Sequence, residues 1–404
     1  MRAVVEHLDA QLFHLPLPRP WGPGVPEHSL VRCDVQASDG RTGVGFTWTP
    51  SIGGRAVIQL LLDDCRGAVV GGPTHPAVVA DRLWRHLHEA GSGGLTSLAR
   101  TAVDTALWDL DLKSRGIGLT DALGRRRDAV PAYGSGVNYD ASLTELQEQT
   151  ARWVQAGYPA VKVKVGHPNL DEDIARIEAV RRVLGPNRRL MIDANQRWTP
   201  PQARRAITAL ARFDLTWVEE PLLADDISGH RTLREQVEVP LALGENQRTL
   251  VEFRELLTEG ACDFLQPNLA RIGGVTPFLQ IAALAAAFNT PVFPHHLPEI
   301  SGQLAMCLPT APMVEDIEDA SFTRLGILDA PAVTIRNGQA QMSDHHVPGL
   351  GLGMRTDHRA PIAPLPLSEA TSSPGPDAPA GGGPPPATPP STTITGGTAH
   401  DSNF

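Results

Sequence analysis

The chain has 404 residues, of which 41% are hydrophobic and 20% charged, and its formal net charge is -10. This length excludes a single small module and predicts either two domains or a barrel with an additional domain. The acidic balance lacks the basic surface that phosphate backbones require, so we expect no nucleic-acid partner.

The cysteines and the apolar runs predict a cytoplasmic protein. The four cysteines lie far apart with no CxxC spacing, which argues against a disulfide framework or a zinc site. Acidic residues interrupt the N-terminus, so no signal peptide is evident. The most apolar later run, residues 279–288, is much shorter than the roughly 20 residues of a membrane helix. We therefore expect no membrane partner.

The first 125 residues predict an α+β domain. Strand-like patterns at residues 4–15 and 29–38 are joined by a Pro/Gly-rich loop, and a helical region follows from 58 to 123. Residues 332–342 again resemble strand and turn. We predict a domain over 1–125 to which a segment over about 320–355 returns.

Residues 126–319 show a different pattern, in which short apolar runs alternate with amphipathic stretches of helical length. Runs that are apolar on both faces suit buried parallel strands, and repeated strand-helix units predict a barrel. The strand-like runs are residues 130–137, 161–165, 190–194, 215–220, 240–245, 264–268, 291–296 and 313–316.

The C-terminal stretch is dominated by small residues and proline. Residues 359–404 contain mainly Pro, Gly, Ser, Thr and Ala, with few large apolar side chains. Such a stretch buries too little surface to offset its ordering entropy, so we predict a disordered tail.

Charged residues end four successive strand-like runs. Asp193, Glu219 and Glu245 are each 26 residues apart, one strand-helix repeat. In a barrel they would converge at the C-terminal ends of adjacent strands, where active sites lie. Three converging carboxylates repel one another unless a hard cation neutralises them, which predicts a Mg²⁺ site.

Two lysines end the strand that precedes these acids. Lys162 and Lys164 are two residues apart, so both face the barrel interior if the strand alternates regularly. Each would then lower the pKa of the other, and a lysine with a lowered pKa can act as a general base. The sequence therefore predicts a proton-abstracting site beside the metal.

The Lys-x-Lys, Asp-x-Asn, Glu-Glu-Pro and Gly-Glu-Asn strand ends, in this order and spacing, resemble the mandelate racemase family of the enolase superfamily. The resemblance covers roughly residues 1–355. It implies a modified (β/α)7β TIM-type barrel with an α+β capping domain. Loops of that domain, near residues 16–26 and 48–53, would close over the substrate. It also implies a homo-oligomer.

The resemblance assigns roles to matching positions. Asp193, Glu219 and Glu245 would hold Mg²⁺, Lys164 would be a base, and Lys162 would help to neutralise the substrate carboxylate. Asn195 resembles a residue that contacts the α-hydroxyl, and Glu315 one that hydrogen-bonds the carboxylate. Metal and protein groups together would stabilise an enediolate.

A histidine is expected on the opposite face of the substrate. His295 fits this position, and His296 is the weaker candidate because strand alternation should turn it away. The aspartate that orients this histidine in the family is replaced by Asn268. An amide orients the ring without stabilising imidazolium, which weakens the case for racemisation. Asn268 and His296 join Asn195 as predicted substrate-binding residues.

These features predict a Mg²⁺-dependent hydro-lyase that acts on a small hydroxy acid. The leading hypothesis is dehydration of a sugar acid to a 2-keto acid. The first alternative is a racemase or epimerase of a 2-hydroxy acid. The second is a barrel with impaired catalysis that has a binding or assembly role, which the replacement of the aspartate and the unusual tail suggest.

Overall fold

The computed structural model describes residues 3–21, 24–310, 312–343 and 347–354. The tail predicted for residues 359–404 lies outside these ranges. Within them, no helix combines the length and apolar character needed to cross a membrane.

The N-terminal region contains an antiparallel sheet in the order β1-β2-β3. Its strands are β1 (Val5–Pro16), β2 (Glu27–Ala37) and β3 (Thr42–Pro50). Strand β3 was not predicted, because its Gly and Thr residues do not give a simple alternation of apolar and polar side chains. The helices that follow are α1 (Gly54–Leu60), α2 (Arg66–Val69), α3 (Pro76–Leu87), α4 (Leu95–Arg115) and α5 (Leu119–Leu123).

Strand β3 and helix α4 touch backbone to backbone. A Cβ added to Gly43 would lie 2.1 Å from the Ala106 carbonyl oxygen, and one added to Gly45 would lie 2.1 Å from that of Ala102. The Thr105 hydroxyl also accepts a hydrogen bond from the Phe46 N–H at 3.0 Å. The two glycines thus allow an approach that no larger residue permits.

Residues 129–317 form the alternation of strands and helices expected of an α/β barrel. Parallel strands pair in the order β10-β4-β5-β6-β7-β8-β9, and Leu265 of β9 forms a parallel bridge with Val292. The bounds are β4 (Ala129–Ser135), β5 (Ala160–Lys164), β6 (Arg189–Asp193), β7 (Leu215–Glu219), β8 (Leu241–Leu243), β9 (Phe264–Leu265) and β10 (Val314–Ile317).

The ring of strands is not closed. The run predicted at residues 291–296 contributes one bridged residue in place of a strand, and no pairing joins it to β10 within the described residues. The run nevertheless hydrogen-bonds to β9 and the residues after it, because the Phe293 N–H donates to the Leu265 carbonyl at 2.7 Å and the His295 N–H to the Pro267 carbonyl at 3.2 Å.

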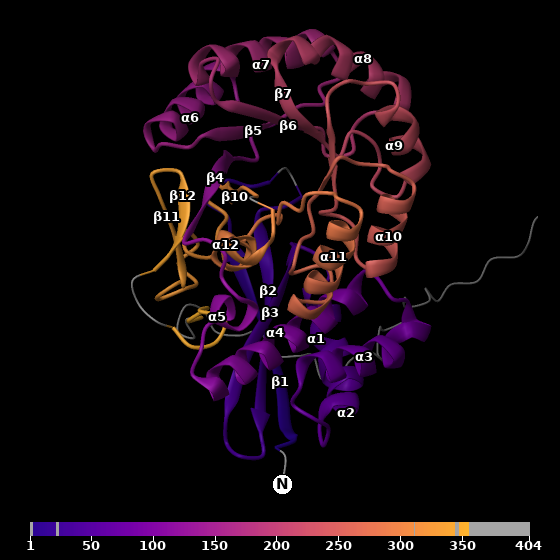
Figure 1. Cartoon of the computed structure of the whole chain (residues 1–404), viewed down its shortest axis with the longest axis vertical. Coiled ribbons are helices and arrows are strands. Elements are labelled where there is room, and N and C mark those ends of the chain that lie inside the picture. The colour runs from indigo at the N-terminus through magenta and orange to yellow at the C-terminus, as the bar shows by residue number, and fades with distance from the viewer. Residues whose placement is uncertain (1–2, 22–23, 311, 344–346, 355–404) are drawn as a thin grey trace, which may run out of the picture. The chain divides into compact units, whose positions relative to one another are not determined.

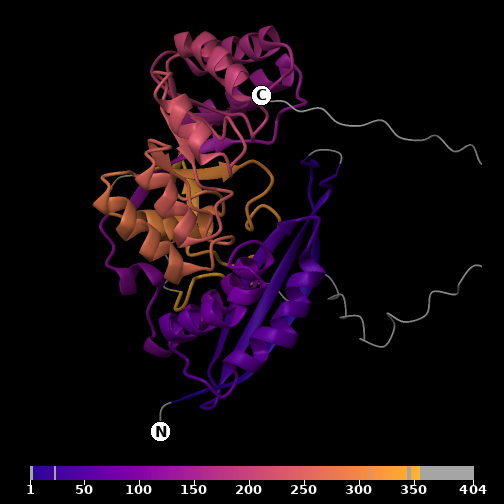
Figure 2. The same ribbon diagram turned by 90° about the vertical axis from the view of Figure 1, so that its right-hand side faces the viewer.

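Helices follow the strands along their outer side (Figures 1 and 2). Several begin where the sequence supplies a capping box, such as Ser142 with Glu145 and Thr249 with Glu252. The bounds are α6 (Leu143–Gln155), α7 (Leu170–Leu184), α8 (Pro200–Leu210), α9 (Ile227–Arg234), α10 (Leu250–Thr258), α11 (Val275–Ala287) and α12 (Pro298–Cys307).

The segment predicted to return to the N-terminal domain contacts both regions. Strands β11 (Val333–Arg336) and β12 (Gln339–Met342) form a hairpin, and β12 pairs antiparallel with β4 (Figure 1). Further on, the Leu350 N–H donates to Asp109 of α4 at 3.0 Å. The proposed boundaries at residues 125 and 319 remain predictions.

Candidate active site and metal centre

The strand register brings charged residues to one level of the sheet. Lys164 of β5 pairs with Asp193 of β6, and Asp193 pairs with Glu219 of β7. All three residues end their strands. Glu245 follows the end of β8 by two residues, and Glu315 lies in β10. These charged groups therefore meet at the carboxyl ends of the parallel strands.

The two predicted lysines have different surroundings. The Lys162 amino group is buried and lies 2.6 Å from Glu219 Oε1, 2.7 Å from Glu315 Oε1 and 3.5 Å from Asp193 Oδ2. The Lys164 amino group lies 2.6 Å from Asp193 Oδ2, and this residue lines a cavity. Lys164 is thus the lysine with access to a bound molecule.

The expectation that the lysines have lowered pKa values is wrong for this arrangement. Burial alone would lower the pKa of Lys162, but Glu219 and Glu315 raise it well above its ordinary value. Burial and Lys162 also act to lower the pKa of Lys164, and Asp193 outweighs them. Each ammonium group is stabilised because it has a carboxylate at contact distance.

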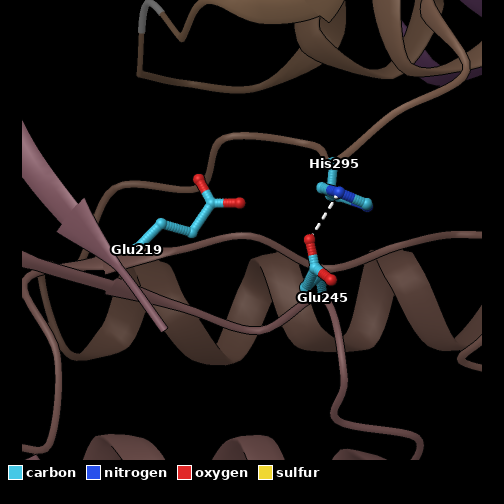
Figure 3. A group of neighbouring side chains, drawn as sticks. All are labelled: Glu219, Glu245 and His295. Carbon is cyan, nitrogen blue, oxygen red and sulfur yellow. Dashed lines mark ion pairs between the residues drawn. The ribbon is translucent and has the colours of Figure 1, made fainter. Parts of the chain in front are cut away.

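Glu219, Glu245 and His295 form a group that could hold a metal ion, since their ligand atoms all lie within 4.8 Å of one another. Figure 3 shows the Glu219 carboxyl group and His295 near the Glu245 side chain. Asp193, predicted as a ligand, is not in this group. Its Oδ2 contacts Lys164, and its Oδ1 accepts a hydrogen bond from the Asn195 N–H at 2.9 Å.

The donor set fits a hard divalent cation. The carboxylates of Asp193, Glu219, Glu220, Glu245 and Glu315 are buried, and they outnumber the cations among them. Burial and then repulsion from Glu245 raise the pKa of Glu220 to about 8. Burial and repulsion from Asp193 also raise the pKa of Glu219 well above its ordinary value, against the attraction of Lys162. Oxygen ligands with excess negative charge are those that Mg²⁺ prefers.

His295 lies between an acid and an amide. Its Nε2 is 2.7 Å from Glu245 Oε2, and its Nδ1 is 2.9 Å from Asn268 Nδ2. Asn268 Oδ1 accepts a hydrogen bond from the Ala270 N–H at 3.0 Å, so the amide nitrogen must be the group that faces the ring. An amide nitrogen only donates; His295 Nδ1 is therefore the acceptor, and the ring proton resides on Nε2.

His296 contacts the N-terminal region. Its ring centroid lies 5.2 Å from that of Trp48 and 6.0 Å from that of Trp21, and the ring is buried. Its positive φ of 57° turns the chain, and its N–H donates to Glu315 Oε2 at 3.3 Å. The residues that line the cavity include His295 and not His296.

The predicted site opens into a cavity of about 690 Å³, a size typical of small-molecule sites. Both regions of the chain line it. Residues from the strand ends are Lys164, Asn195, Glu245, His295 and Glu315, and residues from the N-terminal region include Trp21, Trp48 and Pro50.

Sequence reasoning overlooked several partners of Glu219 and Glu245. Gln266 Nε2 donates to Glu219 Oε2 at 2.7 Å, and Trp217 Nε1 donates to it at 3.3 Å. Arg271 lies 3.8 Å from Glu245 Oε1. Gln266 precedes Asn268 by two residues, so strand alternation applied from Asn268 would have pointed to it.

Known proteins resemble the chain over both regions. Residues 21–124 match the family "Mandelate racemase / muconate lactonizing enzyme, N-terminal domain", and residues 145–358 match "Enolase C-terminal domain-like". A 3,6-anhydro-alpha-L-galactonate cycloisomerase of Streptomyces coelicolor is 35% identical over 303 residues, which cover 74% of this chain and 84% of the relative. An L-talarate/galactarate dehydratase of Salmonella typhimurium is 32% identical, over 83% of this chain and 82% of the relative.

Solved structures share this architecture. An L-talarate dehydratase from Polaromonas sp. JS666, crystallised with Mg and L-glucarate, has a TM-score of 0.79 and 33% identity. The match covers 88% of this chain and 96% of that one. The similarity therefore includes both the N-terminal region and the region of parallel strands.

Proposed function

Because the chain belongs to the mandelate racemase/muconate lactonizing enzyme family of the enolase superfamily, whose barrel fold and Mg²⁺ dependence it shares, we propose that it dehydrates a sugar acid to a 2-keto acid. The observation that carries this proposal is the asymmetry between Lys164 and His295. Lys164 can accept a proton once its ion pair with Asp193 opens, whereas His295 presents an N–H.

In this proposal Asp193, Glu219 and Glu245 hold Mg²⁺. When bound, the cation supplies positive charge that stabilises the substrate carboxylate as it becomes an enediolate. Carboxylate oxygens are preferred to the His295 nitrogen as ligands, because Mg²⁺ is a hard cation. His295 is then available to the substrate.

The protein groups have separate roles in the proposed reaction. The Lys164 amine removes the α-proton. Glu315 lines the cavity beside the substrate carboxylate, and the buried Lys162 ammonium, 2.7 Å from Glu315 Oε1, adds positive charge behind it. Asn195 contacts a hydroxyl group, as its place on the cavity wall allows. After the α-C–H bond has broken, the bond to the β-hydroxyl breaks. The resulting enol tautomerises to the 2-keto acid.

His295 stabilises the departing hydroxyl by donating a hydrogen bond from Nε2. A proton on Nδ1 would face the Asn268 amide protons, so the ring acts through its Nε2 proton. The departing hydroxyl leaves as water by taking a proton from solvent, and the Lys164 ammonium returns the α-proton to solvent, so the reaction conserves protons. Racemisation is disfavoured, because it requires a proton acceptor on each face of the α-carbon.

Cycloisomerisation of a sugar acid or its lactone is the second candidate, because the relative that is 35% identical carries that activity. It also begins at a carbon activated by the carboxylate, and its product has the same mass as its substrate. Dehydration releases one water, so product mass separates the two candidates.

We also propose a cytoplasmic location and a homo-oligomer. All four cysteines are free, in agreement with a reducing compartment.

The experiment is a screen of mono- and diacid sugars, and their lactones, with Mg²⁺. We expect 2-keto acid to form from at least one acid, with solvent deuterium incorporated during turnover. The controls are chelation of the metal and Lys164→Ala, each of which should abolish the product. Lys113→Ala alters an exposed lysine of α4 and should not. Isotope exchange without keto acid would contradict dehydration, and a product of unchanged mass would favour cycloisomerisation.

A further inference from the structure

Besides Lys164 and Arg271, whose charged groups lie near Asp193 and Glu245, two further arginines, Arg19 and Arg197, line the cavity. Arg197 lines it together with Tyr139. Arg197 is exposed, and none of the described residues forms an ion pair or a side-chain hydrogen bond with it. Its guanidinium group stacks on the Tyr139 ring, with the guanidinium carbon 3.4 Å from the ring centroid.

The position of Arg197 is held by several independent contacts. Tyr139 is anchored because its hydroxyl donates to the Gly166 carbonyl at 3.1 Å. Gly166 has a φ of 106°, and a Cβ there would lie 2.8 Å from Arg197 Cδ, so the arginine stem occupies space that only glycine leaves open. The Tyr139 ring and Gly166 together hold this side chain in place.

The turn that carries Arg197 is also fixed. Asn195 and Gln196 both have positive φ, 43° and 64°, which reverses the chain after β6. The Gln196 side chain donates to Glu220 Oε2 at 3.1 Å and accepts from the Ala224 N–H at 2.8 Å. These backbone conformations and hydrogen bonds hold the turn, and Arg197 with it, in one position.

The acidic residues that line the cavity near Arg197 do not form an ion pair with it. Glu145 lines the same cavity, but its carboxylate accepts hydrogen bonds from the Ser142 N–H and hydroxyl, both at 2.8 Å. Asp140 also lines the cavity, and it forms no ion pair with Arg197. The guanidinium charge thus remains available to a molecule in the cavity.

A stacked guanidinium suits a carboxylate partner. Stacking occupies the face of the planar group and leaves its N–H edge free to bind both oxygens of a carboxylate. The substrate carboxylate at the reacting end is already assigned to the metal, Lys162 and Glu315. From these contacts we infer that Arg197 is a specificity-determining residue that binds a second carboxylate, so that the preferred substrate is a dicarboxylic sugar acid.

This inference rests on the proposed sugar-acid function, and equilibrium binding tests it without turnover. Calorimetric titration would compare six-carbon aldarates with aldonates of the same configuration, using Mg²⁺-loaded protein that carries Lys164→Ala. We expect the best aldarate to bind more tightly than its aldonate. Arg197→Gln should weaken aldarate binding on the order of 10- to 100-fold more than aldonate binding, as expected for charge-assisted hydrogen bonds.

Two further variants make the result specific. Arg197→Lys keeps the charge without the planar group and should have an intermediate effect. Arg212 is also exposed and stacked on a ring, Phe213 at 4.9 Å, but it does not line the cavity. Arg212→Gln should therefore not change the ratio of aldarate to aldonate affinity.

The outcomes separate the two proposals. Equal weakening of both acid classes by Arg197→Gln would overturn the inference, and so would binding of no aldarate in the panel. If Arg197 governs aldarate binding but wild-type protein forms no keto acid, the inference stands and dehydration fails. If wild-type protein forms keto acid but Arg197→Gln does not selectively weaken aldarate binding, dehydration stands and the inference about Arg197 fails.

Discussion

The lysine side and the histidine side of the cavity are built differently. Lys164 belongs to β5, which pairs with strands on both sides, and its ammonium group contacts a carboxylate. His295 follows a segment with one bridged residue, and its Nδ1 accepts from an amide. The difference indicates that the proton-accepting group is held rigidly by the sheet, whereas the partner residue Asn268 sets what the histidine can do.

The largest expected effect is on the lysine side. Lys164→Ala removes the proposed base, so we expect kcat to fall by about 10³- to 10⁴-fold, at the upper end of what general base catalysis contributes. His295→Asn keeps a hydrogen-bond donor and should cost less, roughly 10²-fold. Steady-state rates of keto acid formation measure both. Equal losses would contradict the assignment of unequal roles.

The second prediction concerns the amide beside His295. In Asn268→Asp a carboxylate would accept the Nδ1 proton and leave Nε2 as the proton acceptor. We expect deuterium exchange at the histidine face, visible as epimerised substrate in NMR spectra recorded in D2O, to rise about tenfold or more.

Asn268→Ala is the matched control, because it removes the amide without adding a charge. It should produce no epimer. If the alanine variant epimerises the substrate as fast as the aspartate variant, residue 268 does not determine which ring nitrogen of His295 carries the proton.

The smallest effect is expected at the adjacent histidine. His296→Asn keeps a residue that tolerates positive φ but removes a ring packed against Trp21 and Trp48. We expect a loss of about 1–2 kcal/mol in the free energy of unfolding, with kcat within about threefold of wild type. Chemical denaturation and steady-state kinetics test this contrast with His295, and a collapse of kcat would contradict it.

The sequence predicted the strand ends more accurately than the details between them. Equal spacing of Asp193, Glu219 and Glu245 reflects one strand-helix repeat, and the register of β5, β6 and β7 follows from it. Local patterns did not reveal β3, whose two glycines are explained by its contact with α4. They also predicted a full strand at residues 291–296, where apolar character alone does not guarantee a pairing partner.

The electrostatic predictions depended on distances between side chains, and the spacing of residues along the sequence does not give those distances. The lysines were expected to affect each other most, but Asp193 and Glu219 lie at contact distance from their amino groups. Strand alternation already favoured His295 over His296, but the positive φ that turns the chain at His296 was not predicted. The orientation of Asn268 depended on the Ala270 N–H, a backbone group that is invisible in a sequence pattern.

The backbone contact between β3 and α4 has a consequence for how substrate preference can change. Trp48 is carried on this strand, and the strand cannot move closer to the helix without colliding with it. The position of the Trp48 indole is accordingly limited on the side of the strand that faces α4. New specificities are more accessible through residues on turns, such as Arg197, than through remodelling of the cap sheet.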